Sequence, residues 1–502
     1  MKILLVNVKN TDNRVNDFPL GLAYLSATLK DFFECIIYDL NFSDEKEFFE
    51  FMLDNEVGLV GISSCTQYFH ASTQLAKKIK IYSPKTYVVF GGYQATSEYE
   101  YIIKHYIEFD FILMGKGEKS LNQLAQCIEK KDFTGLKDIS HIAYRDENLQ
   151  PVIQNDFRQQ FKRCFEVVPD RTRIHKYPYR KNEINETIAC ISTMRGCYFN
   201  CSFCSISVND KVYLHKYEMI EEDIKNLCLN EEINCLYFND PDFIVNVVHC
   251  KTILEIIKKY SQIKHFKIST RSDTVLKHKD IIEQLLQYGC NSIEIGFESF
   301  SDTQLIRYNK GVTANENIEC IHLLMSLKKR YDFWVVPELI PFDPFVKISE
   351  ITDTVNVLLN CGFKYEHLEP WLFISIVLYP NTEIRNLAIL NKLALDVSGE
   401  LPYWKFQSEK TSVLFSIWMF YKQCLWPDLL ELRKGMRLKM QKTIEISQIQ
   451  KIKNLEMYKK IDEFTFVFLR GLLKSEGDTK ESKALLDEAF RKVKKYKEYN
   501  YN

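Results

Sequence analysis

Three closely spaced cysteines are the strongest chemical signal in the chain. Cys197, Cys201 and Cys204 stand at CxxxCxxC spacing, directly after a run of residues typical of a β-strand. Thiolates are the ligands of iron–sulfur clusters. A closed structural zinc site needs four protein ligands, and His215 is the nearest candidate for a fourth. The spacing therefore favours an iron–sulfur cluster with one iron left open for chemistry, with zinc or a chance group of buried thiols as alternatives.

The cysteines stand at the start of a long alternation of strand and helix patterns. Apolar and β-branched runs alternate with segments whose apolar residues recur at three and four spacing. Six such units predict a barrel or partial barrel, with its chemistry at the carboxyl ends of the strands. The expected strands cover residues 187–194, 235–239, 266–270, 292–297, 333–340 and 367–378, and the expected helices cover 221–229, 250–260, 279–288, 315–329 and 348–361.

A separate alternating series occupies the first part of the chain. Its pattern predicts a Rossmann-like, doubly wound α/β domain of about five parallel strands. Such sheets bind ligands at the carboxyl ends of their strands, near the topological switch point. The expected strands cover residues 3–8, 35–39, 59–63, 87–90 and 111–114, and the expected helices cover 20–31, 45–54, 71–82, 98–105 and 120–130.

The cysteine motif resembles that of the radical S-adenosylmethionine enzymes, in which an aromatic residue, here Phe203, precedes the third cysteine. The resemblance extends over residues 187 to 380. It implies that Cys197, Cys201 and Cys204 bind a [4Fe-4S] cluster and that S-adenosylmethionine chelates the open iron through its amino and carboxylate groups. Electron transfer would then cleave the sulfonium and give a deoxyadenosyl radical. The resemblance also implies an electron donor such as a flavodoxin or ferredoxin.

The ends of several strands carry the residues that this resemblance assigns to S-adenosylmethionine. Carboxylates and carbonyls suit the methionyl ammonium, and a planar guanidinium suits its carboxylate. Without the resemblance, the aspartates would be ordinary turn residues and the arginine a surface residue. In the last strand Asn381 replaces the glycine of the family's Pro-Gly-Thr turn, which affects a turn rather than a ligand. The assigned residues are Phe203 in the cysteine motif, Asn239, Asp240 and Asp242 after the second strand, Ser269 and Arg271 at the third, and Glu298 at the fourth, expected to reach the ribose hydroxyls and followed by the Lys310-Gly311 turn.

Small and hydroxyl-bearing residues follow four strands of the first domain. Small residues let the backbone approach a bulky corrinoid, and hydroxyls can bond its nucleotide tail. Together these segments resemble the cobalamin-binding domain that precedes the radical domain in one large branch of the superfamily, so cobalamin is an expected cofactor. The DxHxxG motif of another cobalamin family is absent, because His70 and His141 lack the flanking residues; a domain that keeps the fold but has lost the ligand is the alternative. The expected contacts are Leu20, Gly21, Ser63, Ser64, Cys65, Thr66, Gly91, Gly92, Gln94, Ala95, Thr96, Gly115, Gly117 and Glu118.

The resemblance implies a cobalamin-dependent radical methyltransferase that places a methyl group on an unactivated carbon of a peptide or natural-product intermediate. A second hypothesis keeps the scaffold but runs an oxidation, cyclisation or ring rearrangement without methyl transfer. A methylthiotransferase would bring three more cluster cysteines and a terminal β-barrel, and Cys35, Cys65 and Cys127 lack the matching context. A non-catalytic iron–sulfur scaffold is the remaining reading, and it predicts no cleavage of S-adenosylmethionine.

Composition sets the outer limits of these hypotheses. The chain has 502 residues and a formal net charge of -1, so it lacks the basic field that draws proteins to nucleic acid. It has no apolar run long enough for a membrane span, and we expect a cytoplasmic monomer with no nucleic-acid or membrane partner. The expected divisions are 1–130 for the cobalamin-binding domain, 131–185 for a connecting segment, 186–385 for the partial barrel and 386–502 for a helical C-terminal domain.

Aromatic residues in the C-terminal region allow two interpretations. They could cover the open end of the barrel and help to select the substrate. Packing in the protein core is the alternative, and it is the more common fate of aromatic side chains. The residues concerned are Trp404, Trp418, Phe420, Tyr421 and Trp426.

Overall fold

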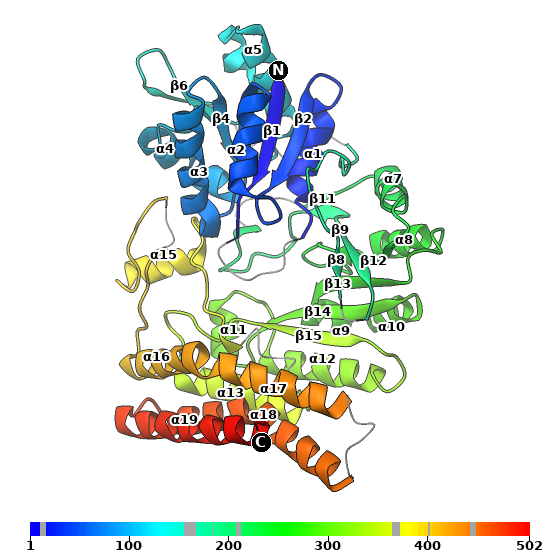
Figure 1. The fold of residues 1–502 in the computed structure, drawn as a ribbon, viewed down its shortest axis with the longest axis vertical. Helices are drawn as coiled ribbons and strands as arrows, with labels where there is room; N and C mark the ends of the chain where they lie inside the picture. The colour runs from blue at the N-terminus through cyan, green and yellow to red at the C-terminus, as the bar shows by residue number, and fades with distance from the viewer. Residues whose placement is uncertain are drawn as a thin grey trace.

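The computed structural model describes residues 1–10, 17–154, 167–182, 184–206, 212–363, 372–399, 402–441 and 448–501. Three layers follow one another along the long axis of the molecule (Figure 1). The N-terminal sheet and its helices form one end, the barrel strands lie in the middle, and a stack of helices forms the other end. Within the described ranges, no helix combines the length and the apolar character that a membrane crossing requires.

The N-terminal layer is a seven-stranded sheet whose two faces carry separate hydrophobic cores. Consecutive residues of its first strand, such as Ile3 and Leu4, belong to different cores because successive side chains of a strand point to opposite faces. The strand order is β2-β1-β3-β4-β5-β6-β7, so the order reverses between β1 and β3, where such sheets bind ligands. The parallel strands are β1 (Lys2–Asn7), β2 (Glu34–Asp39), β3 (Val57–Ser63), β4 (Tyr87–Gly91) and β5 (Phe111–Leu113), and the helices are α1 (Leu20–Leu29), α2 (Glu45–Asp54), α3 (Phe69–Tyr82), α4 (Tyr93–His105) and α5 (Glu118–Lys130). The predicted doubly wound domain is therefore confirmed.

Two strands of this sheet lie in the segment that we expected to be a connection. β6 (Ile142–Arg145) pairs antiparallel with β5, and β7 (Pro151–Gln154) pairs antiparallel with β6. The sequence gives little sign of them because β7 is half-buried along its whole length and shows no alternation of apolar and polar residues. This part of the expected connecting segment thus extends the first domain's sheet.

The second sheet is the curved wall of a partial barrel, as predicted. Its order is β15-β14-β13-β12-β9-β8, and all neighbours run parallel except the short strand β8 (Arg180–Lys181). The predicted sixth strand, 367–378, begins outside the described residues, and Ser375 forms a parallel bridge with Phe342. The long strands are β9 (Thr187–Ile191), β12 (Ile233–Phe238), β13 (His265–Arg271), β14 (Cys290–Glu298) and β15 (Trp334–Leu339).

The first barrel strand is shorter than the sequence pattern indicates. β9 ends at Ile191, and the chain turns into β10 (Met194–Arg195), which pairs antiparallel with β11 (Tyr213–Leu214). The cysteines lie in the loop between β10 and β11, so this hairpin is the base from which the cysteine loop extends.

Helices cover the outer face of the barrel sheet and continue into the C-terminal layer. One hydrophobic core runs through both, which explains the buried Trp418, Tyr421 and Trp426. The core-packing interpretation therefore holds for these three aromatic residues, whereas Trp404 is partly buried and Phe420 is exposed. The helices are α7 (Tyr217–Leu227), α8 (Val247–Ile257), α9 (Ser272–Lys277), α10 (Lys279–Gln287), α11 (Asp302–Arg307), α12 (Ala314–Leu327), α13 (Ile348–Asn360), α15 (Glu383–Leu390), α16 (Glu409–Cys424), α17 (Trp426–Gln441), α18 (Gln448–Lys474) and α19 (Thr479–Tyr501).

Candidate active site

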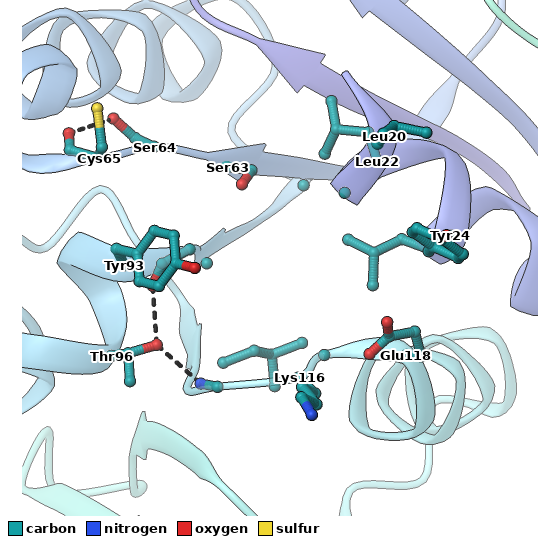
Figure 2. Close-up of a pocket in the computed structure, with 18 of the residues that line it drawn as sticks. Leu20, Leu22, Tyr24, Ser63, Ser64, Cys65, Tyr93, Thr96, Lys116 and Glu118 are labelled. Carbon is teal, nitrogen blue, oxygen red and sulfur yellow. Dashed lines mark hydrogen bonds between the residues drawn. The ribbon is translucent and has the colours of Figure 1, made fainter. Parts of the chain in front are cut away.

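A partly enclosed cavity of about 500 Å³ lies between the N-terminal sheet and the base of the cysteine loop. One side is formed by the carboxyl ends of β1, β3, β4 and β5 and by the first turns of α1, α4 and α5 (Figure 2). The other side belongs to the barrel and includes Ser192, Met194, Arg195, Gly196 and Asn239. The cavity therefore borders both of the expected cofactor sites.

The cavity wall after β4 is made largely of backbone. Gly92 has a φ of +94°, and a Cβ atom there would lie 2.6 Å from the carbonyl oxygen of Ser64. The hydroxyl of Thr96 donates to the carbonyl of Gly92 (2.8 Å) and accepts from the N–H of Gly115 (2.8 Å), which ties two neighbouring loops together (Figure 2). At Gly21 a Cβ would meet nothing within 4 Å. Tight glycine turns beside open space fit a bulky flat group such as a corrin ring.

Most of the predicted cobalamin contacts line this cavity, but Thr66, Gln94 and Ala95 do not. All three are buried inside the domain, and the amide of Gln94 donates to Glu98 (2.6 Å). For Gln94 and Ala95 the reason is the helical period: Tyr93 and Thr96, three residues apart, share the cavity face of α4, and the two residues between them point elsewhere. The predicted residues in the lining are Leu20, Gly21, Ser63, Ser64, Cys65, Gly91, Gly92, Thr96, Gly115, Gly117 and Glu118.

The cysteine loop is shaped at both of its ends. Gly196 has a φ of +74° and turns the chain into the loop. Ser202 fixes the other end, because its N–H donates to the carbonyl of Tyr308 (2.9 Å) and its hydroxyl donates to the carbonyl of Arg307 (2.8 Å). Phe203 packs edge-on against Tyr308, with the ring centres 5.3 Å apart. The three motif cysteines are half-buried and free of disulfide bonds.

Two buried cations lie beside this loop. Arg271 places Nη1 3.6 Å from Sγ of Cys201, and Lys310 forms a buried ion pair with Glu298 (2.9 Å). Burial lowers the pKa of both cations, but Asp273 raises that of Arg271 and Glu298 raises that of Lys310, so that each pKa ends above its ordinary value. Arg271 and Lys310 thus place permanent positive charge beside the cysteine loop.

The donor set of the loop suits a multi-iron cluster. Across the described ranges, no three histidine, cysteine or carboxylate side chains converge as ligands of a single metal ion. A four-iron cluster does not need such convergence, because each thiolate bonds a different iron. Three cysteines outside any disulfide bond, with cations beside them, therefore fit the cluster that the motif predicts.

The aspartates after β12 bond to groups within the protein. Asp240 accepts from the N–H groups of Thr193 (2.8 Å) and Met194 (3.1 Å), and Asp242 accepts from two threonine hydroxyls, each 2.7 Å away. Burial raises the pKa of each aspartate to about 6, against the opposing effect of these donors. Asp240 thus holds the base of the cysteine loop, and direct contact of either carboxylate with the methionyl ammonium stays a prediction.

The end of β14 has an unusual backbone conformation. Glu298 has a φ of +63°, which a residue with a side chain adopts rarely. A Cβ at Gly296 would lie 2.8 Å from Oε1 of Glu298, so the glycine leaves room for the carboxylate that pairs with Lys310. Asn381 also has a φ of +63°, which asparagine tolerates well; the predicted turn is therefore kept without the glycine.

Carboxylates inside the barrel were not predicted. Glu294 accepts from the hydroxyls of Tyr237 (3.0 Å) and of Ser269, the latter a predicted site residue (2.9 Å). Burial, with Glu298 and Glu294 nearby, raises the pKa of Glu338 on β15 to about 8. A single acidic residue within an apolar strand belongs to no recognisable sequence motif. Glu294 and Glu338 are therefore identified only by their neighbours in space.

The contacts between the two domains were also missed. Arg195, two residues before the first cysteine, forms an ion pair with Glu118 of α5, and its guanidinium lies 4.4 Å from the centre of the Tyr24 ring. The carboxylate of Glu118, a predicted cobalamin contact, is thus already paired with a residue of the cysteine loop. Lys116 and Tyr93 also line the cavity. These two residues were not predicted, although their neighbours Gly115 and Gly92 were, and the pairing of Arg195 with Glu118 across domains leaves no signal in the sequence.

Two family descriptions match the chain in this order. The B12 binding domain family matches residues 14–125, and the Radical SAM superfamily matches residues 191–354. The first match contains most of the glycine turns around the cavity, and the second begins just before the cysteine loop. Both matches agree with the geometry of the two sites.

Several curated proteins are similar to the chain over long stretches. An uncharacterized methyltransferase of Pyrococcus horikoshii, PH0819, is 25% identical over 79% of this chain and 85% of its own length. The anaerobic magnesium-protoporphyrin IX monomethyl ester cyclase of Rubrivivax gelatinosus is 23% identical over 61% of this chain and 56% of the cyclase. The hopanoid C-3 methylase of Methylococcus capsulatus is 24% identical over 50% of this chain and 47% of the methylase. The chain thus spans most of the first protein and about half of each of the other two.

Solved structures show the same fold. The cobalamin-dependent S-adenosylmethionine radical enzyme OxsB matches with a TM-score of 0.75 and 16% identity, over 100% of this chain and 80% of OxsB. Its structure with aqua-cobalamin and S-adenosylmethionine bound matches with a TM-score of 0.71. The methyltransferase TsrM from Kitasatospora setae matches with a TM-score of 0.58 and 17% identity, over 76% of this chain and 74% of TsrM. With the two family matches and the geometry of the cavity, this chain is a cobalamin-dependent radical S-adenosylmethionine enzyme, and its cofactors are cobalamin, S-adenosylmethionine and a [4Fe-4S] cluster.

Proposed function

We propose that the enzyme transfers a methyl group to an unactivated carbon of a peptide or natural-product intermediate. When bound, the cluster and S-adenosylmethionine supply the radical that activates the substrate carbon, and the corrinoid supplies the methyl group. The protein's own contribution is to hold these groups at a fixed separation and to keep water away from them. A small-molecule or peptide substrate and a one-electron donor such as a flavodoxin or ferredoxin belong to this proposal.

The observation that carries the proposal is the shared wall of the cavity. Ser192, Met194 and Gly196, from the base of the cysteine loop, line the same cavity as the glycine turns of the B12-binding domain. A corrin face in this cavity would therefore look toward the residues next to Cys197. Methyl transfer to a substrate radical requires such proximity between the two cofactor sites.

The relatives support methyl transfer but also favour a second candidate. The first relative is named a methyltransferase and another a C-3 methylase, whereas the Rubrivivax protein is named a cyclase. A non-methylating oxidation or cyclisation on the same scaffold is therefore the alternative. The two differ in the fate of the methyl group of S-adenosylmethionine.

The test follows that methyl group without requiring the substrate. The reconstituted enzyme is reduced, supplied with S-adenosylmethionine carrying a deuterated methyl group, and separated into protein and corrinoid fractions. We expect deuterated methyl label in the corrinoid fraction, measured by mass spectrometry. A corrinoid that stays unlabelled while deoxyadenosine accumulates would contradict methyl transfer and favour the alternative.

A further inference from the structure

Arg195 joins the base of the cysteine loop to the B12-binding domain. Arg195 belongs to β10, and only Gly196 separates it from Cys197. Its Nη1 donates to Oε1 of Glu118, the first residue of α5, and its guanidinium lies 4.4 Å from the centre of the Tyr24 ring in α1. We call the group of Arg195, Glu118 and Tyr24 the Arg195 clamp.

The members of the clamp are largely removed from water. The side chains of Arg195 and Glu118 keep 21% and 5% of their accessible surface. Such an ion pair is screened less than a surface pair, and removing one partner leaves the other charge poorly solvated. Glu118 also stands at the N-terminus of α5, where the helix dipole favours a negative charge. The pair is therefore a firm contact between the two domains.

Tyr24 contacts the same hairpin at a second point. Its ring stacks on His215, with the ring centres 5.4 Å apart and an angle of 4° between the planes. His215 follows β11, and its N–H donates to the carbonyl of Thr193 (3.0 Å). Arg195 and Tyr213 are register partners in the β10–β11 pair. The Tyr24 ring of the B12-binding domain thus contacts Arg195 at the end of β10 and His215 just after β11. These two strands form the hairpin from which the cysteine loop extends.

The barrel holds the other side of this hairpin through Asp240. Its carboxylate accepts from Thr193 and Met194, the residues just before Arg195. Adjacent residues of one short segment are therefore held by a carboxylate of the barrel and by a carboxylate of the B12-binding domain. The same segment lines the corrinoid cavity and leads into Cys197. A shift at this segment would move the cluster relative to the corrinoid site.

We propose that the Arg195 clamp is a positioning device that fixes the separation and orientation of the cobalt relative to the iron–sulfur cluster. The proposal rests on the two cofactor sites and not on methyl transfer, so it applies equally to a non-methylating enzyme. Geometry of this kind matters, because a displacement of about 1 Å at reacting groups can cost about 100-fold in rate. Arg195 and Glu118 are positioning residues here, acting through the hairpin and α5.

The test measures the magnetic interaction between the two metal centres in the holoenzyme. With cobalt as Co(II) and the cluster reduced, each centre is paramagnetic, and the cluster speeds the relaxation of the cobalt signal. That enhancement falls steeply as the centres move apart. In the Glu118→Gln and Arg195→Met variants we expect loss of most of the enhancement in electron paramagnetic resonance power-saturation curves, at full iron and corrinoid content. Arg195→Lys, which keeps the charge but not the planar fork, should give an intermediate value.

A second contact between the domains supplies the matched control. Arg385 of α15 lies 3.8 Å from the carboxylate of Glu98 in α4, and it is not a member of the Arg195 clamp. The Arg385→Met variant loosens the domains elsewhere and should keep the relaxation enhancement of the unmodified enzyme. Unchanged enhancement in both clamp variants, or an equal loss in the Arg385→Met control, would overturn the proposal. Failure of both clamp variants to bind one cofactor would also overturn it, because the residues would then serve binding instead.

Discussion

The two cofactor sites of this enzyme are formed by different kinds of chemical group. The B12-binding side is formed by glycine turns and hydroxyl groups, and a Cβ atom at Gly92 would lie only 2.6 Å from the carbonyl oxygen of Ser64. The radical side is formed by thiols and buried charges, with Arg271 beside Cys201 and Lys310 paired with Glu298. The shape of the first site therefore depends on the absence of side chains at its glycines. The second site depends on the presence of thiols and charged side chains. Added atoms should therefore damage the first site, whereas removed charges and thiols should damage the second.

The largest expected effect is the loss of one cluster thiol. Cys201→Ala removes one of the three thiols predicted to bind the cluster, so the cluster should be lost or incomplete. We expect cleavage of S-adenosylmethionine to fall to background while the protein still takes up cobalamin. Iron content, deoxyadenosine yield and the corrinoid absorption spectrum are the measurements.

Cys228→Ala is the matched control, because Cys228 is half-buried like Cys201 but lies at the end of α7. It should keep the iron content and the cleavage activity of the unmodified enzyme. Deoxyadenosine formation at the normal rate in the Cys201→Ala variant would contradict the assignment of the cluster. Loss of corrinoid binding in that variant would contradict the independence of the two sites.

A large effect on stability is expected from the buried ion pair of the radical side. Lys310→Met leaves the Glu298 carboxylate, whose side chain keeps only 10% of its surface, without its partner. Breaking a buried pair in this way costs about 3 to 5 kcal/mol of unfolding free energy. Urea unfolding of the apoprotein measures it, and an unchanged midpoint would contradict the structural importance of the pair.

The double variant separates stability from function at this pair. Glu298→Gln combined with Lys310→Met removes both charges, and a buried pair replaced on both sides is often neutral in stability. We expect most of the lost stability to return. S-adenosylmethionine cleavage should be low in the double variant, because Glu298, which the resemblance assigns to the ribose hydroxyls, has lost its charge.

On the B12-binding side, an added methyl group should be more harmful at Gly92 than at Gly21. Gly92→Ala places a Cβ 2.6 Å from the Ser64 carbonyl in a backbone conformation that only glycine adopts readily, at a cost of about 1 to 3 kcal/mol. Gly21→Ala meets no protein atom within 4 Å and improves helix propensity in α1, so stability should be kept. Corrinoid titration followed by absorbance should show weaker binding in both variants. Equal thermal stability of the two would contradict the argument from backbone space.

The sequence predicts the elements well where apolar periodicity is strong. The five parallel strands of the first domain and the helices between them agree with the pattern, because each strand is buried on both faces and reads as an apolar run. The antiparallel strands β6 and β7 escape prediction, because each has only four residues, too few for such a pattern to stand out. The cysteine motif predicts its own loop, since its spacing is fixed by the cluster and not by neighbours in space.

Contacts in the site were harder to predict from sequence. Glycine turns point to the cavity, yet the period of α4 directs Gln94 away from it and Tyr93 toward it. Motif likeness alone could not show that Asp240 is engaged by backbone N–H groups or that Glu118 is engaged by Arg195. The first pairing depends on how two loops of the barrel meet and the second on how two domains meet, and neither can be read from the sequence without the fold.

The smallest expected effect is a pH dependence that originates inside the barrel. Burial and the nearby Glu298 and Glu294 carboxylates raise the pKa of Glu338 to about 8, although Lys310 opposes the shift. In the unfolded chain the same group titrates at its ordinary, lower pKa. The folded state therefore binds this proton more tightly, and the stability it contributes is complete at acidic pH and is lost as the pH rises through about 8.

The Glu338→Gln variant should remove this part of the pH dependence. Because glutamine does not titrate, the melting temperature of its apoprotein should fall less between pH 6 and pH 9 than that of the unmodified chain, by a few degrees. Glu231→Gln, at an exposed carboxylate, is the control and should follow the unmodified chain. Parallel melting curves for all three proteins over this range would mean that Glu338 ionises in the fold as readily as in water. The buried charges that affect stability on the radical side would then be limited to Lys310 and Glu298 and would not include Glu338 inside the barrel.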